Sequence, residues 1–470
     1  MKQLIYLFTI TAVLFASCNT DSQKGKTAET FQPIETNVSA RPAGQKHVVG
    51  LTSPKMDTVR VGFIGLGMRG PSAVQRFTHI PGAKIVALCD LHPDRVEKSQ
   101  QILDKAGVPR AAAYSGSEDA WKELCQRDDI DLVYIATDWK RHAQMMIYAM
   151  EQGKHVACEV PAAMTMEEIW DVVNTAERTQ KHCMQLENCV YDFFELTTLN
   201  MAQQGVLGDI LYAEGAYIHQ LEDFWDSYEN DWRMEYNKTH RGDIYATHGM
   251  GPACQVLDIH RGDKMNYLVA MDSKPVSIPA YLKEKRGEEA PDFKNGQHTM
   301  TMIRTENGKT IHIQHDVASP RPYSRMYQVQ GTNGFANKYP NEGYALKADA
   351  VEAGTVPNHE NLSAHSYVSD EVKKVLMDKY KHPIHIELEE TAKKVGGHGG
   401  MDFIMDYRLV YCLQNGLPLD MDLYDLAEWC SLAPLTALSL ENNSAPVAVP
   451  DFTRGHWNDV KGFRHAFVKN

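Results

Sequence analysis

Residues 59–70 read Val-Arg-Val-Gly-Phe-Ile-Gly-Leu-Gly-Met-Arg-Gly, a short β-branched run that leads directly into three closely spaced glycines. The run has the composition of a buried strand, and a helix-like pattern follows the last glycine. In such a strand–turn–helix unit, Gly65 permits the tight turn, Gly67 lets the backbone approach a pyrophosphate, and Gly70 allows close packing. Because the helix N-terminus then faces the phosphates, the sequence predicts a dinucleotide site.

The next acidic residue supports this prediction and favours one coenzyme. A second strand pattern at 84–89 ends in Asp90, 20 residues after Gly70, where a carboxylate can bind ribose hydroxyls. The same carboxylate would repel a 2′-phosphate, and no arginine immediately follows it. The sequence therefore predicts NAD rather than NADP as the cofactor.

Two more strand patterns, 131–136 and 154–158, continue the alternation of strands and helices. The first leads into Thr-Asp-Trp-Lys-Arg-His at 137–142, and the second leads into Glu-Val-Pro at 159–161. Ligands of doubly wound α/β folds bind at the carboxyl ends of parallel strands, so both segments are candidate coenzyme contacts. For His142 the alternative is a helix-cap histidine that contacts no ligand.

The second half of the chain has a different pattern, which predicts an α+β domain with an open, mainly antiparallel sheet. A helix pattern at 193–204 comes first, and helix patterns at 401–415 and 423–439 are expected to pack back onto the body. The strand-like runs between them are 210–217, 266–272, 297–304, 309–317 and 325–330. The expected order is an α/β Rossmann domain at 46–185, a substrate-binding and catalytic α+β domain at 186–450, and a C-terminal tail at 451–470.

The composition is that of a globular protein that needs no metal or disulfide to stabilise its core. Of the 470 residues, 43% are hydrophobic and 23% are charged, which is enough for two domains. With 48 lysines and arginines against 61 acids, the net charge is −13. This charge argues against a partner bound through its phosphate backbone, so no nucleic acid is expected.

Cysteine and histidine spacing predicts neither disulfides nor a metal site. Eight of the nine cysteines follow Cys18, and none forms a Cys-x-x-Cys pair. Several fall inside apolar strand-like runs, so buried free thiols are expected. His240, His248 and His260 have no spacing typical of a ligand set, and no metal is predicted.

The N-terminus has the pattern of an export signal. An apolar run at 4–16 is too short to cross a membrane as a helix, and Leu-Phe-Ala-Ser at 14–17 precedes Cys18. This resembles a bacterial lipobox, which implies a signal peptide at 1–17 and a lipid on Cys18 that anchors the exported protein to a bacterial membrane, facing the periplasm or the cell surface. The alternative is a plain secretory signal with an incidental cysteine. The polar composition of 18–45 predicts a flexible tether.

Two segments of the second half carry candidate substrate chemistry. Residues 217–236 hold six aromatic side chains among charged and amide groups, a combination that suits a carbohydrate. The alternative is an aromatic interface or a small satellite core. In the following loop, 242–252, Tyr245 and His248 stand three apart just before a helix pattern. Imidazole and a suitably placed phenol can both carry protons, so these two are candidate catalytic residues, the alternative being a structural loop.

The overall pattern resembles the glucose–fructose oxidoreductase/inositol dehydrogenase superfamily. Its dehydrogenases usually carry Glu-Lys-Pro where this chain has Glu-Val-Pro at 159–161, and valine cannot transfer a proton. Gly-Asp-x-Tyr-x-Thr-His-Gly-x-Gly-Pro at 242–252, with Leu-Asp-Ile at 257–259, is similar to glycoside hydrolase family 109 within the same superfamily. Gly-Gly-Met-Asp-Phe at 399–403 is similar too, whereas Ala246 stands where that family commonly has proline.

The resemblance implies which residues contact the coenzyme and the substrate. With the three glycines of the turn, the cofactor contacts are Gly65, Gly67, Met68, Arg69, Gly70, Asp90, Trp139, Lys140, Arg141, His142, Glu159, Val160 and Asn188. The implied substrate contacts are Tyr217, Arg233, Tyr245, Ala246, Thr247, His248 and a tyrosine in 320–327, for which Tyr323 is favoured over Tyr327.

The same resemblance implies hydrolysis of terminal α-N-acetylgalactosamine through an NAD-dependent cycle of oxidation, elimination, water addition and reduction. NAD-dependent glycosidases are an exception to the usual pair of catalytic carboxylates. Tyr245 and His248 are the candidates for the proton transfers. The alternatives are an NAD-dependent sugar oxidoreductase with net hydride transfer and a sugar-binding lipoprotein without catalysis. The expected partners are a glycan or small-molecule substrate and the membrane, with a homo-oligomer left open.

Overall fold

The run at 59–64 becomes an inner strand of a six-stranded parallel sheet in the computed structural model, which describes residues 32–468. The strand order is β3-β2-β1-β4-β5-β6, and all neighbouring strands are parallel. The strands are β1 (Val59–Ile64), β2 (Ala83–Cys89), β3 (Ala112–Tyr114), β4 (Leu132–Ile135), β5 (His155–Cys158) and β6 (Cys183–Gln185). This order confirms the predicted Rossmann fold, which binds its ligand where the order reverses, between β1 and β4.

Helices connect the parallel strands, and both faces of the sheet are buried, as parallel sheets require. On one face, the ring of Phe63 contacts that of Phe77 with centroids 5.1 Å apart. On the other, Val133 and Ile135 belong to a separate buried cluster that includes Met146. The connecting helices are α1 (Gly70–Phe77), α2 (Pro93–Ala106), α3 (Ala120–Cys125), α4 (Trp139–Glu151) and α5 (Met166–Thr179).

The second half forms an eight-stranded sheet in the order β13-β12-β11-β7-β10-β9-β8-β14. All neighbouring strands are antiparallel except β7 and β10, which confirms the mainly antiparallel prediction. The strands are β7 (Ile210–Ile218), β8 (Met265–Asp272), β9 (Thr299–Thr305), β10 (Thr310–Asp316), β11 (Gln328–Gly331), β12 (Gly334–Asn337), β13 (Gly343–Leu346) and β14 (Val447–Ala448). The last three of these strands were not predicted.

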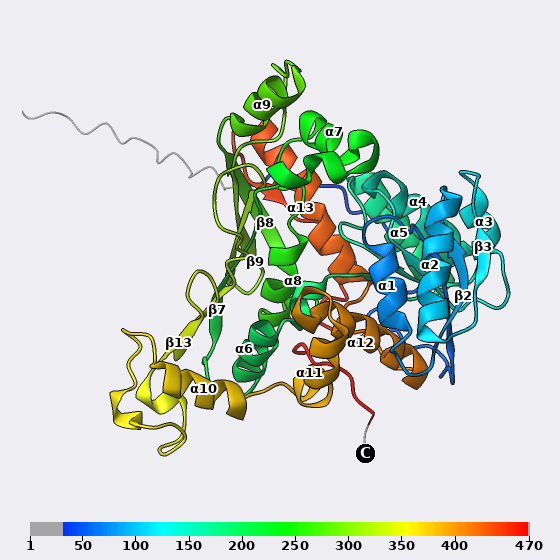
Figure 1. The fold of residues 1–470 in the computed structure, drawn as a ribbon. Helices are drawn as coiled ribbons and strands as arrows, with labels where there is room; N and C mark the ends of the chain where they lie inside the picture. The colour runs from blue at the N-terminus through cyan, green and yellow to red at the C-terminus, as the bar shows by residue number, and fades with distance from the viewer. Residues whose placement is uncertain (1–31, 469–470) are drawn as a thin grey trace, which may run out of the picture. The chain divides into compact units, whose positions relative to one another are not determined.

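One face of this sheet is covered by helices, whereas β8 and β9 expose alternate side chains on the other, among them Met271, Met300 and Met302. Figure 1 shows α6 and α8 on the covered side. A Cβ on Gly215 of β7 would lie 2.4 Å from the carbonyl oxygen of Gly249 in α8, so both glycines are needed for this close contact. The helices are α6 (Phe193–Gln203), α7 (Trp232–Thr239), α8 (Thr247–Val256), α9 (Ser277–Tyr281), α10 (Asp370–Lys379) and α11 (Pro383–Val395).

Two C-terminal helices, α12 (Met401–Asn415) and α13 (Leu423–Glu441), were expected to pack back onto the body, and the structure places them against the nucleotide-binding half (Figure 1). Arg76 of α1 pairs with Asp406 of α12, with Nε and Oδ2 2.7 Å apart and both side chains buried. Leu426 of α13 lies in the same buried cluster as Val133 of β4. The eight cysteines after residue 18 are buried with free thiols, which confirms that prediction.

Residues near both ends of the described chain pack on the body, although those at the N-terminal end were predicted to belong to a flexible tether. Ile34 exchanges backbone hydrogen bonds with Pro446 and Ala448, and Arg41 pairs with Glu177 at 3.0 Å. The predicted tether at 18–45 is therefore wrong for this end of the range, because Ile34 and Arg41 have partners on the body. The C-terminal tail also packs, with Phe463 buried. The signal peptide and Cys18 lie outside the described residues, and within 32–468 no helix has the length and apolarity to cross a membrane.

Candidate active site

The glycine-rich turn between β1 and α1 has the geometry of a phosphate cradle. Gly65 has a φ of 91°, and a Cβ on Gly70 would lie 2.0 Å from the carbonyl oxygen of Gly65. Both positions therefore require glycine. A Cβ on Gly67 would meet nothing nearer than the Arg95 guanidinium at 3.6 Å, so the backbone there is open to a phosphate. These residues fit a bound dinucleotide.

Asp90 at the end of β2 holds this turn and faces the expected ribose position. Its Oδ2 accepts a hydrogen bond from the Leu66 amide at 2.6 Å, and its Oδ1 accepts one from the His92 amide at 2.9 Å. Arg95 lies 3.7 Å from Oδ1, although the sequence showed no arginine directly after Asp90. Glu229 pairs with Arg95 at 2.7 Å and so neutralises the cation that would otherwise attract a 2′-phosphate.

Three of the predicted coenzyme contacts, Arg69, Glu159 and Asn188, are brought together through Asp402 of α12, to which the sequence gave no role. Arg69 lies 3.4 Å from Glu159 and 3.2 Å from Asp402. Asn188 donates a hydrogen bond to Asp402 at 2.5 Å, and His398 contacts the same carboxylate at 2.9 Å. Burial works to raise the pKa of Asp402, but the hydrogen bond from His398 and the nearby guanidinium groups outweigh it and lower the pKa.

Of the four predicted coenzyme contacts at 139–142, only Trp139 lies in the buried cluster of the candidate site. Trp139 is buried in the site cluster, whereas Lys140 lines a hollow on the outer side of α4 and α5. Arg141 lies 3.5 Å from Asp138. The ring nitrogens of His142 lie 2.9 Å and 3.0 Å from main-chain carbonyl oxygens, which favours the structural alternative for that residue. Met68, next to the phosphate turn, is 56% exposed.

Aromatic rings surround the guanidinium of Arg233. Its Cζ lies 4.7 Å from the ring centroid of Tyr245, 5.1 Å from that of Trp139 and 5.8 Å from that of Tyr217. Its Nη1 donates to the Tyr228 hydroxyl at 2.8 Å, and among residues 32–468 no carboxylate forms an ion pair with it. A buried cation held by rings rather than by an acid is suited to bind oxygen atoms of a ligand.

The aromatic segment forms a small core, as the second interpretation of 217–236 predicted, and contact with a carbohydrate stays a prediction. Trp225 is 1% exposed and Met234 is fully buried. Val160 from the nucleotide-binding half packs into the same cluster as Trp139 and Tyr245. This cluster therefore joins predicted coenzyme contacts to predicted substrate contacts.

His248 forms a pair with Glu187, a residue that sequence reasoning missed. The Nδ1 of His248 lies 2.7 Å and 2.9 Å from the two carboxylate oxygens of Glu187, which is fully buried. Burial works to raise the pKa of Glu187, but His248 and the amide of Cys189 outweigh it and lower the pKa. Nδ1 is thus occupied, and Nε2 remains for a ligand.

Tyr245 stands next to this pair. Its ring centroid lies 5.2 Å from that of His248 and 4.5 Å from that of Tyr217. Burial raises the pKa of Tyr245 well above its usual value, and Arg233 acts in the opposite direction. The two residues between the candidate catalytic side chains are buried: Ala246 has a φ of −72°, which proline also adopts, and Thr247 begins α8.

Burial separates the two candidate tyrosines of 320–327. Tyr323 is 42% exposed, and its ring meets that of His219 edge-on with centroids 5.1 Å apart. The hydroxyl of Tyr217 lies 3.0 Å from Nδ1 of His219, so Tyr323 is connected to the candidate site. Tyr327 is 2% exposed and donates its hydroxyl to the Glu195 carbonyl at 3.4 Å. Only Tyr323 is therefore placed to contact a ligand.

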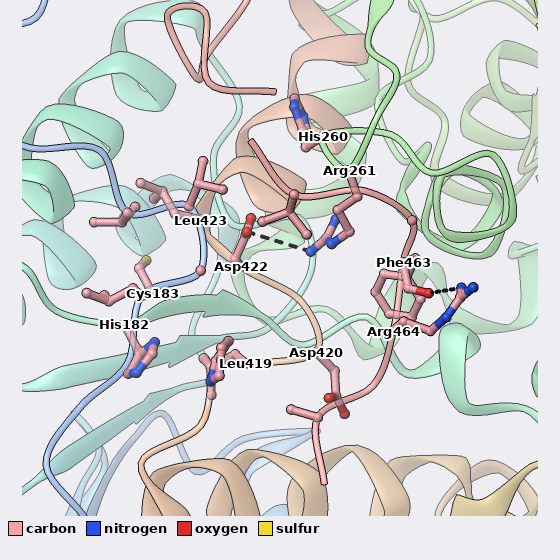
Figure 2. Close-up of a pocket in the computed structure, with 18 of the residues that line it drawn as sticks. His182, Cys183, His260, Arg261, Leu419, Asp420, Asp422, Leu423, Phe463 and Arg464 are labelled. Carbon is pink, nitrogen blue, oxygen red and sulfur yellow. Dashed lines mark hydrogen bonds and ion pairs between the residues drawn. The ribbon is translucent and has the colours of Figure 1, made fainter. Parts of the chain in front are cut away.

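A cavity of about 250 Å³ lies away from these residues (Figure 2). It is formed where segment 48–51, the beginning of β6, loop 418–423 and the C-terminal segment 460–466 meet. The cavity lies at the beginning of β6, whereas the glycine turn and Asp90 lie at the carboxyl ends of the parallel strands. The cavity is therefore at the opposite edge of the sheet. It is thus not the coenzyme site.

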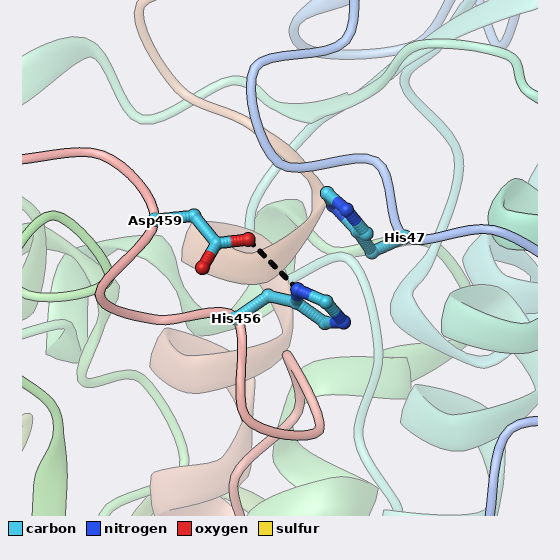
Figure 3. A group of neighbouring side chains, drawn as sticks. All are labelled: His47, His456 and Asp459. Atoms are coloured by element: carbon cyan, nitrogen blue, oxygen red, sulfur yellow. Dashed lines mark hydrogen bonds and ion pairs between the residues drawn. The ribbon is translucent and has the colours of Figure 1, made fainter.

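Two groups of potential metal ligands occur among residues 32–468, and neither has the geometry or charge of a metal centre. In Figure 3 the rings of His47 and His456 stack with centroids 3.9 Å apart and planes at 18°, so their in-plane lone pairs do not converge on one point. The second group is Glu187, His248 and Cys189. There, burial raises the pKa of the Cys189 thiol, and the Arg325 guanidinium lies 2.9 Å from its sulfur, which opposes a cation.

Comparisons with known proteins agree with the two-domain fold. The family profile described as "Oxidoreductase family, NAD-binding Rossmann fold" matches residues 59–186, and "Glycosyl hydrolase 109, C-terminal domain" matches residues 191–459. Among solved structures, levoglucosan dehydrogenase in complex with NADH is 18% identical, with a TM-score of 0.62 over 84% of this chain and all of its own. The apo scyllo-inositol dehydrogenase of Lactobacillus casei is 15% identical, with a TM-score of 0.57 over 84% of this chain and 99% of its own. These two show a common fold, and the cofactor is NAD.

Relatives with the family name are much more similar. Glycosyl hydrolase family 109 protein 1 of Bacteroides fragilis (strain YCH46) is 73% identical over 445 residues, which are 95% of this chain and 96% of its own. The protein of the same name from Bacteroides thetaiotaomicron is 68% identical over 469 residues and the full length of both chains. This chain is therefore a member of glycosyl hydrolase family 109, with an NAD-binding Rossmann domain.

Proposed function

We propose that this enzyme hydrolyses terminal α-N-acetylgalactosamine residues by an oxidation–elimination–addition–reduction cycle on NAD. The observation that carries the proposal is the pairing of His248 with buried Glu187 beside Tyr245 and Arg233. When bound, NAD supplies a reversible hydride acceptor for carbon 3 of the sugar. The glycine turn and Asp90 would hold it.

The carboxylates around Tyr245 do not offer the usual acid–base pair of a glycosidase. That mechanism needs one carboxylic acid that is protonated near neutral pH. Glu187 and Asp402 both have lowered pKa values, and Glu159 is paired with Arg69. Burial raises the pKa of Asp243 to about 7, but its side chain is fully buried and so is not accessible to a ligand. Proton transfer is therefore assigned to other groups.

His248 is the better candidate for the base. After oxidation at carbon 3, the proton on carbon 2 is acidic, and Nε2 of His248 can take it while Nδ1 donates to Glu187. The buried carboxylate then stabilises the charge on the ring. The Tyr245 hydroxyl serves the other transfer, to and from the glycosidic oxygen, and Arg233 orients oxygen atoms of the sugar within its aromatic surroundings.

A panel of p-nitrophenyl glycosides tests the proposal, with α- and β-linked N-acetylgalactosamine, N-acetylglucosamine, galactose and glucose. Release of p-nitrophenol from the α-N-acetylgalactosaminide without net NADH is the expected result. In D₂O the released sugar should carry deuterium at carbon 2, because the base exchanges that proton. Hydrolysis without deuterium would refute the cycle. Net NADH with a free sugar would indicate an oxidoreductase, and sugar binding without turnover would indicate a binding protein.

We propose further that the chain is exported and anchored by lipid on Cys18, on the support of the apolar run and small residues before it. Radiolabelled palmitate should be incorporated by bacteria that express the full chain and not by those that express Cys18→Ala. Equal labelling of the two would refute the anchor.

A further inference from the structure

Glu229, in the second half of the chain, contacts the nucleotide-binding half next to the expected ribose position. One carboxylate oxygen lies 2.6 Å from Nε2 of His92, and the other lies 2.7 Å from Nη1 of Arg95. The same Arg95 lies 3.7 Å from Asp90. A carboxylate from one half thus bridges His92, which precedes α2, and Arg95, in the first turn of α2, in the other half.

The segment that carries Glu229, residues 222–231, is held from its own side and is called the strap below. It consists of two short helical turns, η2 (Glu222–Ser227) and η3 (Glu229–Asp231). Arg286 pairs with Asp226 at 2.6 Å and with Asp231 at 2.5 Å, and Trp225 is buried beneath.

The backbone after Glu229 is also specialised. Asn230 and Asp231 have φ values of 52° and 55°, in the left-handed region that only a few non-glycine residues tolerate. Two such residues in succession turn the chain sharply and present Glu229 toward the other half. The anchored strap and its turn therefore fix where this carboxylate lies.

The coenzyme would lie under this bridge. The guanidinium of Arg95 is the nearest group to the open side of Gly67, where the pyrophosphate approaches, and it is close to Asp90, where the ribose binds. The bridge from Glu229 to Arg95 and His92 thus spans the adenosine end of the site. Trp225 and Tyr228 of the strap pack in the same cluster as Tyr245, and the Tyr228 hydroxyl accepts a hydrogen bond from Arg233. The strap therefore borders the predicted substrate residues as well as the adenosine end of the coenzyme site.

We propose that Glu229 is a coenzyme-retention residue: the strap closes over the adenosine end, so NAD leaves only after both contacts of Glu229 break. A second consequence concerns selectivity. While Glu229 neutralises Arg95, a 2′-phosphate gains no partner there, and the two acids Asp90 and Glu229 disfavour it. This inference concerns coenzyme release and discrimination and does not depend on which sugar is cleaved.

The experiment measures release of NADH, whose fluorescence reports its binding, from the purified full chain mixed with excess NAD⁺. Glu229→Gln should raise the release rate by about two- to thirtyfold, the effect of weakening two partly exposed polar contacts, one of them an ion pair with Arg95. It should also raise the affinity for NADPH relative to NADH, because Arg95 is then free. Glu222→Gln, in the same strap but hydrogen-bonded only to Gln220, is the control and should match the wild type.

Two results would overturn the proposal: a Glu229→Gln release rate within twofold of the wild type, or equal weakening of NADH and NADPH, which a merely loosened fold would produce. Arg286→Met provides an independent test, because it removes the anchor and leaves Glu229 in place. It should also speed NADH release, and an unchanged rate would count against the strap. Circular dichroism establishes that each variant is folded.

Discussion

Replacement of Glu187 by glutamine tests the pair on which proton transfer depends. Glutamine has nearly the same shape but no charge, and its amide can present a donor where the ring of His248 also donates. The carboxylate is fully buried, and its oxygens lie 2.7 Å and 2.9 Å from Nδ1. The variant therefore removes a charge-assisted hydrogen bond and leaves the surrounding packing in place.

The magnitude follows from that geometry. A hydrogen bond to a charged group contributes about 1.5–3 kcal/mol, and burial places this one in the upper part of the range. If the interaction matters only once the ring has accepted a proton, the loss falls on kcat rather than KM. At about 1.4 kcal/mol per factor of ten, kcat should fall by about 40- to 150-fold.

The chain offers a matched control in Glu428, a second buried acid that pairs with a histidine. Its Oε2 lies 3.2 Å from Nε2 of His260, and both side chains are buried. Glu428→Gln should lower the thermal midpoint without changing kcat on the aryl α-N-acetylgalactosaminide, whereas Glu187→Gln should lower kcat with NADH still bound. If kcat of Glu187→Gln stays within threefold of the wild type, Glu187 does not support the base.

Further variants test the glycine turn, a buried acid and the two tyrosines. Gly67→Ala should fold normally but bind NADH at least tenfold more weakly by fluorescence titration, whereas Gly70→Ala should lower the thermal midpoint because its Cβ meets backbone at 2.0 Å. Burial raises the pKa of Asp243 to about 7, whereas an aspartate in the unfolded chain ionises near about pH 4. Raising the pH from 4 to 7 therefore ionises this group mainly in the unfolded state, which lowers the free energy of unfolding by up to about 4 kcal/mol. Asp243→Asn should abolish that part of the decline in urea unfolding, and an unchanged pH dependence would contradict it. Tyr323→Phe should raise KM severalfold at unchanged stability, and Tyr327→Phe should lower stability at unchanged KM. The reverse pattern would refute the assignment of Tyr323 to ligand binding.

The nucleotide-binding half was predictable because its determinants are local. The strand, the three glycines and the acid at the end of the next strand all lie within residues 59–90, in one β-α-β unit. Their spacing follows from how a turn approaches a phosphate, so it can be recognised without tertiary information. The strand runs of the second sheet were found for the same reason, since alternation in β9 buries every other side chain.

The remaining site residues could not be identified from spacing, because folding brings together distant positions. Glu187 is 61 residues from His248, and Asn188 is 214 residues from Asp402. In sequence these acids are ordinary charged residues. Their roles appear only when burial removes water and a particular partner supplies the compensating charge.

Burial also decided between alternatives that the sequence left open. His142 of α4 contacts the carbonyl oxygens of Thr137 and Pro161, and Tyr327, just before β11, is buried in the core. The contacts between Ile34 and the C-terminal strand β14 could not be predicted for another reason. A two-stranded contact as short as β14 leaves no periodic pattern to detect.

The last helix, α13, contributes Leu426 and Ala427 to the buried cluster of the parallel sheet, so the amino-terminal half lacks part of its interior until the final residues have been made. During synthesis, an apolar surface of the nascent domain stays uncovered until Leu426 is added, 293 residues after Val133. We therefore expect the coenzyme to bind only after α13 has been synthesised. Fragments that end before α13 should be caught by chaperones and proteases rather than accumulate as a separate nucleotide-binding unit.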